Sequence, residues 1–287
     1  MRNCKPMLSV LGLVLAFAVA GAAGDAPLTF KFTAINIPGA AQVFPGGVND
    51  SGVVVGAYLD TSGVYHGFML KGKTVTTIDD PKGTNNICKN ISPKGAAIVG
   101  YYLNASDYSV SFLFKNNKFT AIPGPKGAVS TQAYGINDAG EIVGEFLDSN
   151  FLAHGFLLKG GKYTTLNVPT AVITEATGIN DSGTIVLYWE NSNNAFESSL
   201  YNGSTYKTIN VPGATSSMAW DIDSSGDVVY QWSDATGTHG ALLKQGKYFK
   251  FDDPHGVGST YGFGLNDHSQ IVGSYDVSGF HGFEATY

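Results

Sequence analysis

A ten-residue motif, Gly-Ile-Asn-Asp-x-Gly-x-Ile-Val-Gly, recurs along this chain of 287 residues at a nearly constant interval. Copies of varying quality lie at Gly47–Gly56, Asn90–Gly100, Gly135–Gly144, Gly178–Leu187, Asp221–Tyr230 and Gly264–Gly273. The first Asn position of the motif is occupied by Asn49, Ser92, Asn137, Asn180, Asp223 and Asn266, at spacings of 43, 45, 43, 43 and 43 residues. A period in the low forties, built from short apolar runs and Gly turns, is typical of a β-propeller blade.

Each repeat unit contains four segments that read as short strands. In the third unit these are residues 130–135, Glu141–Leu147, His154–Leu158 and Tyr163–Val168. The Asn-Asp-x-Gly between the first two is a tight turn, because Asn and Asp bond to nearby backbone and Gly accepts positive φ. Branched and aromatic residues fill the runs, and no helical period competes with them.

The two ends of the chain are permuted relative to the repeat. The segment Phe30–Pro38 resembles the fourth strand of a unit, whereas the last unit ends at Tyr287 without one. An open array would leave an unpaired strand edge at each end, which invites aggregation. The sequence therefore predicts an all-β, six-bladed β-propeller of four-stranded blades, closed by the N-terminal strand completing the last blade. A linear β-solenoid is the alternative, but it gives no reason for the permuted ends.

Residues 1–23 are predicted to be a signal peptide, and residues 28–287 a single propeller domain. Arg2 and Lys5 precede an apolar run from Met7 to Ala20, which is followed by small residues. This pattern suits signal-peptidase cleavage after Ala20 or Ala23, so we expect a secreted or periplasmic protein. The repeat units are expected at about 39–81, 82–123, 124–169, 170–212, 213–254, and 255–287 together with 28–38.

Charge argues against several partners. Loss of Arg2, the only arginine, and of Lys5 leaves 15 lysines against 23 acidic residues and a net charge of −8. An acidic chain without arginine is poorly suited to nucleic acid or to anionic membranes, and no membrane span is expected after cleavage. Cys88 is then the single cysteine, so no intrachain disulfide can form. Nothing in the sequence indicates the oligomeric state.

The motif, followed by His-Gly-Phe and by a segment of the type Tyr-Thr-Thr-Ile-Asn-x-Pro-Gly-Ala, resembles the bacterial extracellular HAF-repeat family. The resemblance covers the chain from about Phe30 to Tyr287. It implies export and a repeat fold, and it implies no general activity. The second, fourth and fifth units depart from the family pattern, since Val110-Ser111-Phe112, Glu197-Ser198-Ser199 and His239-Gly240-Ala241 replace His-Gly-Phe.

Four histidines recur at one position of the unit, each downstream of an acid across the turn between the second and third strands. The pairs are Asp60 with His66, Asp148 with His154, Asp234 with His239 and Asp276 with His281. A catalytic base is needed once, whereas a hydrogen bond that fixes a turn is needed in every blade, so repetition favours a structural role. The Asn-Asp turns offer too few oxygens for calcium, and we expect neither a metal nor a cofactor.

One position of the second strand is aromatic in every unit. Its residues are Tyr58, Tyr102, Phe146, Trp189, Trp232 and Tyr275. Platforms for sugars are conceivable, but packing between neighbouring blades explains all six more simply.

Two columns of the first strand vary freely and are predicted to face the central channel. Three residues before the Asn position stand Gly46, Lys89, Tyr134, Thr177, Trp220 and Phe263, and five before it stand Phe44, Ile87, Gln132, Glu175, Met218 and Tyr261. The column between them is small, as a crowded axis requires. The candidate ligand-binding residues are Lys89, Gln132, Tyr134, Glu175, Trp220, Tyr261 and Phe263, with drift in a plugged channel as the alternative.

No catalytic template is convincing. The chain has no Gly-x-Ser-x-Gly elbow and no convergent zinc ligands. Carboxylates for glycoside chemistry could come from Glu145, Glu175 and Glu190 on adjoining blades. We therefore expect a non-catalytic propeller that binds an extracellular glycan or protein at the channel mouth. The alternatives are a glycan or ester hydrolase or lyase with Glu175 as acid/base and Lys89 or Tyr134 as charge stabiliser, and a structural envelope or matrix protein.

Overall fold

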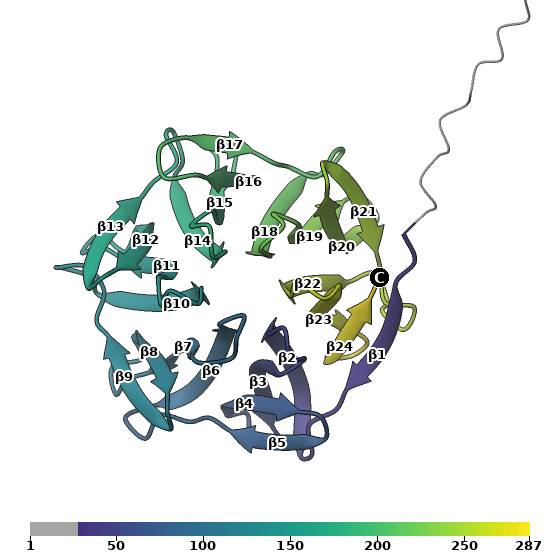
Figure 1. The fold of residues 1–287 in the computed structure, drawn as a ribbon, viewed down its shortest axis with the longest axis horizontal. Coiled ribbons are helices and arrows are strands. Elements are labelled where there is room, and N and C mark those ends of the chain that lie inside the picture. Colours follow the sequence, from purple (N-terminus) through teal and green to yellow (C-terminus); the bar gives the residue numbers. More distant parts are fainter. Residues whose placement is uncertain (1–27) are drawn as a thin grey trace, which may run out of the picture.

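The computed structural model describes residues 28–287, which form a ring of six four-stranded antiparallel sheets (Figure 1). The first strand of each sheet lies nearest the centre and the fourth lies at the rim. The chain is thus a six-bladed β-propeller, as predicted. The predicted signal peptide falls outside the described residues. Within residues 28–287, no helix is long and apolar enough to cross a membrane.

Five blades are continuous in sequence. Blade one contains β2 (Ala40–Val48), β3 (Val54–Asp60), β4 (Tyr65–Lys71) and β5 (Thr74–Thr77), and blade two contains β6 (Thr84–Ile91), β7 (Ile98–Leu103), β8 (Ser109–Lys115) and β9 (Lys118–Ile122). Blade three contains β10 (Ser130–Ile136), β11 (Ile142–Leu147), β12 (Ala153–Lys159) and β13 (Lys162–Leu166). Blade four contains β14 (Ile173–Ile179), β15 (Ile185–Glu190), β16 (Phe196–Tyr201) and β17 (Tyr206–Thr208), and blade five contains β18 (Ser216–Ile222), β19 (Val228–Asp234), β20 (Gly237–Lys244) and β21 (Lys247–Phe251).

The sixth blade joins the two ends of the chain. It consists of β22 (Thr260–Leu265), β23 (Gln270–Asp276), β24 (Phe280–Thr286) and, at its outer edge, β1 (Lys31–Ile35). The β1–β24 register places Ala34 opposite Phe283, and Figure 1 shows the two strands side by side. The predicted closure is confirmed, and it leaves the last blade with four strands like the others.

The hydrophobic core lies between blades rather than inside one central mass. Each of six clusters combines side chains of two neighbouring blades; one, for example, joins Val186 and Ile209 of blade four to Tyr230 and Trp232 of blade five. The predicted aromatic column belongs to these clusters in every blade. Packing between blades is therefore the role of that column.

Three of the four repeated histidines, His66, His154 and His239, are held from two sides, whereas the predicted Asp276–His281 pair is not among the contacts of the described residues. His66 Nε2 lies 3.5 Å from Asp60, as the sequence suggested, and Nδ1 lies 2.7 Å from Asp79 on the fourth-strand side. His154 and His239 have equivalent pairs of partners, and all four histidines stack on the aromatic column. The hydrogen bond to Asp79 raises the pKa of His66. These contacts support the structural interpretation.

The Asn-Asp turns tie neighbouring blades together. Asn180 Oδ1 accepts a hydrogen bond from the Thr184 amide inside its own turn, while its Nδ2 donates to the Asp223 carbonyl of the next blade at 3.0 Å. Asn137 and Asn266 make equivalent bonds to the blades that follow them. A side chain that satisfies its own turn and the adjacent one explains why Asn recurs at this position.

Asn180→Ala is expected to destabilise the protein by about 2–3 kcal/mol, because a buried turn amide and a buried carbonyl each lose a partner. Urea unfolding would measure the loss. Asn180→Asp keeps the acceptor for the turn amide but sets a buried carboxylate against the Asp223 carbonyl, so it should cost at least as much. Ser51→Ala, at the exposed equivalent position of the blade-one turn, is the control. A loss for Asn180→Ala no larger than that of the control would contradict the inter-blade role.

Candidate functional site

A β-bulge interrupts the first strand of every blade just before the Asn-Asp turn. In blade three, Ala133 pairs with Gly144 and Gly135 pairs with Val143, which leaves Tyr134 as the extra residue. The corresponding residues of all six blades are Gly46, Lys89, Tyr134, Thr177, Trp220 and Phe263, here called the bulge ring. Bulges re-aim side chains and are common beside functional sites. Here they turn one residue of each blade towards the axis.

Towards the Asn-Asp turns, which we call the turn end, the next residue of each blade closes the axis. Four of the six are glycines, and they are in van der Waals contact across blades: a Cβ on Gly135 would lie 2.9 Å from the Gly178 Cα. The exceptions are Asn90 in blade two and Asp221 in blade five, whose side chains hydrogen-bond to each other from opposite blades. A glycine at this level permits the close approach of backbones that six converging strands require.

The bulge ring fills the channel below this layer. Lys89 reaches over the axis so that its Nζ lies 5.0 Å from the centroid of the Tyr134 ring and 5.2 Å from that of Trp220. Trp220 also packs against Tyr188 and Phe263 with ring centroids 5.5 and 5.4 Å apart. The cavity left among the bulge ring is ≈ 20 Å³, which holds about one water. These side chains form a floor rather than the wall of an open cavity.

A polar network lies beneath this floor, in blades three and four. The Tyr134 hydroxyl is 3.1 Å from Gln132 Oε1 and 3.2 Å from Glu145 Oε1, and it also bonds to Glu175. The Tyr188 hydroxyl donates to Glu175 Oε2. One phenol carries one proton, so Tyr134 cannot donate to all three acceptors. The arrangement is satisfied when one carboxyl is protonated and donates to the Tyr134 oxygen, and the Gln132 amide is turned so that its NH2 group donates as well.

Burial sets the protonation of this network. Glu145 is 7 % exposed, and desolvation together with the charge of Glu175 raises its pKa to about 8. Desolvation also raises the pKa of Glu175 and lowers that of Lys89 to about 8. Two carboxyls this close retain one proton between them near neutral pH. The site thus combines hydrogen-bond donors and acceptors with little net charge.

All seven candidate residues from the sequence lie on the channel and join one contact network. Tyr134 contacts Gln132, Glu175 and Lys89 as described above. Lys89 also contacts Trp220, Trp220 packs against Phe263, and the ring centroids of Phe263 and Tyr261 are 6.1 Å apart. Glu190, which the sequence grouped with Glu145 and Glu175, ends β15 and is not part of this network among the described residues.

Sequence reasoning missed Tyr188 and left Glu145 outside the candidate set. Both are second-strand residues directly opposite the channel column, since Glu145 pairs with Gln132 and Tyr188 with Glu175. They stand eight residues after the Asn position of their units. That column, read together with the first-strand columns, could have identified them.

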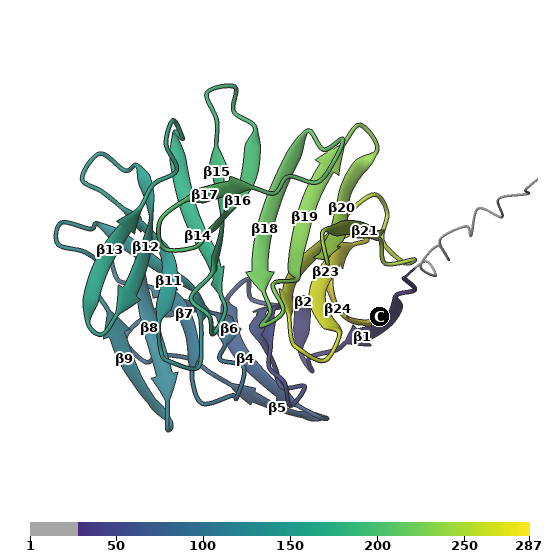
Figure 2. The ribbon, with the colours of Figure 1, turned by 45° about the horizontal axis from the view of Figure 1, so that its top comes forward.

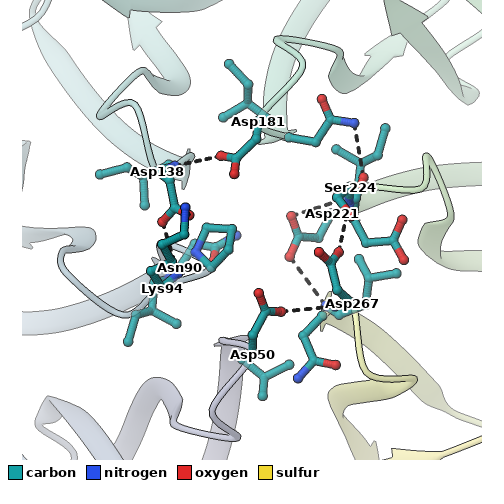
Figure 3. A pocket seen from close by; sticks show the side chains of 18 residues that line it. Asp50, Asn90, Lys94, Asp138, Asp181, Asp221, Ser224 and Asp267 are labelled. Carbon is teal, nitrogen blue, oxygen red and sulfur yellow. Dashed lines mark hydrogen bonds and ion pairs between the residues drawn. The ribbon is translucent and has the colours of Figure 1, made fainter.

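A larger hollow of ≈ 230 Å³ lies on the other side of the closed axis, at the turn end. Figure 3 shows Asp50, Asp138, Asp181 and Asp267 around it. Their carboxylates accept hydrogen bonds from the backbone of the preceding turn, as Asp181 does from the Asp138 amide at 2.8 Å. Lys94 pairs with Asp138 at 3.1 Å. The acids thus have a structural use, and within residues 28–287 no group of three metal-ligating side chains is found.

The fold has many known counterparts. A TolB-type protein from Agrobacterium tumefaciens superposes with a TM-score of 0.58 at 15 % identity, over 86 % of this chain and 90 % of that one. The fold is shared. Virginiamycin B lyase from Staphylococcus aureus superposes with a TM-score of 0.56 at 11 % identity, over 90 % of this chain and 100 % of that one. The lectin of Aleuria aurantia bound to Fucα1-6GlcNAc superposes with a TM-score of 0.53 at 12 % identity, over 83 % of this chain and 89 % of that one. No protein-family model matches the sequence, and no curated protein sequence matches it.

Proposed function

We propose that this chain is an exported, non-catalytic β-propeller of the HAF-repeat type that binds a glycan at the loop end of its central channel. The loop end is the face formed by the loops after the second and fourth strands. The observation that carries the proposal is the polar network of Gln132, Tyr134, Glu145, Glu175 and Tyr188. A propeller core does not need it, and buried ionisable groups cost stability.

The opposite wall of the channel supports a sugar as the ligand. Tyr261 packs between Phe263 and Phe280, and Phe280 also packs against Phe44. Phe44, Gln132, Glu175 and Tyr261 all keep part of their surface exposed. Aromatic faces attract the C–H face of a pyranose, and carboxyl and amide groups bond its hydroxyls. The lectin counterpart, bound to a fucosylated sugar, is compatible with this ligand class.

Glu175→Gln is expected to weaken glycan binding by about tenfold, because a charge-assisted acceptor of a sugar hydroxyl is lost. The purified protein would be screened on an array of glucose-, galactose-, mannose-, fucose- and N-acetylglucosamine-terminated oligosaccharides, and the best responder titrated by calorimetry. Glu284→Gln, a third-strand carboxylate bonded to Gln270, is the matched control. No binding by the parent protein would overturn the proposal and favour a structural envelope or matrix role.

A hydrolase or lyase is the second candidate, and the carboxyl pair joined through Tyr134 favours it. Acid–base chemistry on glycans usually uses two carboxyls, one protonated and one ionised, and a pair that retains one proton between them supplies both. Incubating the protein with the glycan that it binds and separating the products by chromatography would distinguish the two. Products that disappear in both Glu145→Gln and Glu175→Gln would establish catalysis, whereas an unchanged glycan would leave a binding protein.

A further inference from the structure

The loop end also carries apolar side chains that the core does not use. Within residues 28–287, the strongly exposed large apolar residues all lie in loops after second or fourth strands; they are Val64, Tyr108, Phe151, Leu152, Val172 and Val257. The loops of blades two and three bring three of them together. The Tyr108 and Phe151 rings are 6.5 Å apart and 23° from parallel, and Leu152 follows Phe151. Figure 2, tilted by 45° from the view of Figure 1, shows β7, β8, β11 and β12, and the loops that carry these residues connect β7 to β8 and β11 to β12.

Phe151 occupies a backbone conformation that does not suit it. Its φ is +61°, and its amide bonds to the Asp148 carbonyl at 3.0 Å. The same bond and a positive φ recur at the same turn position of three other blades, where the residues are Gly63, Asp107 and Asn194. Gly, Asp and Asn tolerate this conformation, whereas a bulky side chain is strained there.

Packing does not compensate for that strain. The Phe151 side chain is 59 % exposed and Leu152 is 45 % exposed. A residue that is strained in the backbone and exposed in the side chain contributes little to folding. Positions that break a local rule without a structural gain are expected at functional sites. Three other blades serve as an internal comparison, because they build the same turn with Gly, Asp or Asn at the position of Phe151.

A cavity begins at the residue that follows Tyr108 in the chain. A hollow of ≈ 180 Å³ between blades two and three is lined by Ser109, which follows Tyr108, and by Val129, Ser130 and Thr131. Ser130 Oγ donates to the Ser109 carbonyl at 3.3 Å. An apolar platform next to a concave space with hydroxyl and carbonyl groups is the usual form of a small-ligand site.

The size of the platform decides its occupant. Three side chains are few beside the 20–30 residues that each partner contributes to a typical protein interface. The surrounding turn residues are polar and exposed, including Ser106, Ser149 and Asn150. A single pyranose ring matches both features, because one face is apolar and its rim carries hydroxyls.

We propose that Tyr108, Phe151 and Leu152 form a second carbohydrate-binding platform, on which a pyranose ring stacks while its hydroxyls enter the cavity beside Ser109 and Ser130. This site lies at the rim of the propeller, apart from the channel network. It shares the ligand class of the proposed function and rests on it in that respect alone. Tyr108 and Phe151 provide the stacking surface, and the cavity sets the orientation of the sugar.

Phe151→Asn separates this role from a structural one. Asn stands at the same turn position in blade four, so the substitution relieves strain, and the melting temperature is expected to rise by about 2–4 °C. Binding to the arrayed oligosaccharides should nevertheless weaken by about tenfold or more, and Tyr108→Ala should do the same. Val64→Ala, at the position of Tyr108 in blade one, is the control and should leave binding unchanged.

Running Glu175→Gln in the same titration keeps the two sites distinct. Loss of binding in Phe151→Asn but not in Glu175→Gln supports the platform and removes the channel site. The reverse result overturns the platform and leaves the channel site intact. Unchanged affinity or a lower melting temperature in Phe151→Asn also overturns the platform, as does a protein partner that replaces any glycan binding.

Discussion

A chain that begins at Pro38, and therefore lacks β1, is expected to lose its folded monomeric state. Ile35 and Ile37 are each 6 % exposed and belong to the cluster between blades six and one. Phe30 and Phe32 pack against Phe251, and Phe32 also packs against Phe283. Removing these four side chains forfeits on the order of 5–10 kcal/mol of burial. That is comparable to the whole stability of a typical domain, about 5–15 kcal/mol.

The truncation also creates a new edge. Without β1, β24 becomes an edge strand, and its outer edge presents unpaired amides and carbonyls that can pair with another chain. Size-exclusion chromatography and thermal unfolding followed by circular dichroism would show aggregates or a non-cooperative transition. A chain that begins at residue 28 keeps every described strand and should behave like the full-length protein.

Thr33→Ala is the matched point control for β1. Thr33 is exposed and pairs with Glu284 in β24, so its side chain contributes little burial. The variant should melt within about 1–2 °C of the parent, whereas Phe32→Ala should cost about 2–3 kcal/mol. A truncated chain that melts cooperatively as a monomer near the parent temperature would show that closure by β1 is dispensable.

Glu145→Gln is expected to stabilise the protein at pH 8 and to remove much of its pH dependence. The carboxyl keeps its proton up to a pKa of about 8 when folded, against the usual 4.5. Below pH 4.5 both states are protonated and stability is unaffected. Between pH 4.5 and 8 the unfolded chain binds fewer protons, so the free energy of unfolding falls as pH rises. At 1.36 kcal/mol per unit, the upper bound is about 5 kcal/mol.

Thermal melts between pH 4.5 and 8.5 would measure this effect. The parent should melt several degrees lower at pH 8 than at pH 5, and Glu145→Gln should fall less, because Gln bonds to Tyr134 without titrating. Asp221, whose pKa burial raises to about 7, adds a remaining slope of the same sign. Glu141→Gln is the control: the bond to Lys159 lowers the Glu141 pKa, so the stability from that carboxylate is lost only below about pH 4.5, and the slope between pH 4.5 and 8.5 should stay as in the parent.

The contrary result is equally specific. If Glu145→Gln melts lower than the parent at pH 8, the Glu145 carboxyl is ionised and paired with Lys89 rather than protonated. Breaking a buried ion pair is strongly destabilising. The sign of the shift at pH 8 therefore reports the protonation of the network directly.

The architecture could be predicted from the sequence because the repeat is local. Each unit encodes its own four strands, and the permuted segment at Phe30–Pro38 has one partner that removes both open edges. The alternation of small and variable residues likewise identified the columns that face the axis. Both inferences rest on patterns that can be read along the chain: the alternation of side chains with period two within a strand, and the repeat of the whole unit with a period in the low forties.

What the tertiary structure alone decided is how the blades meet. The bulges in the first strands of blades two and five turn Lys89 and Trp220 towards each other across the axis. The register between first and second strands brings Glu145 and Tyr188 into the polar network. The sequence repeat shows which residues are equivalent, but equivalent residues need not touch. Contacts around an axis depend on the convergence of six strands and on local twist, and no single unit carries that information. The strain at Phe151 became visible for the same reason, since only the folded turns show which residue sits at positive φ.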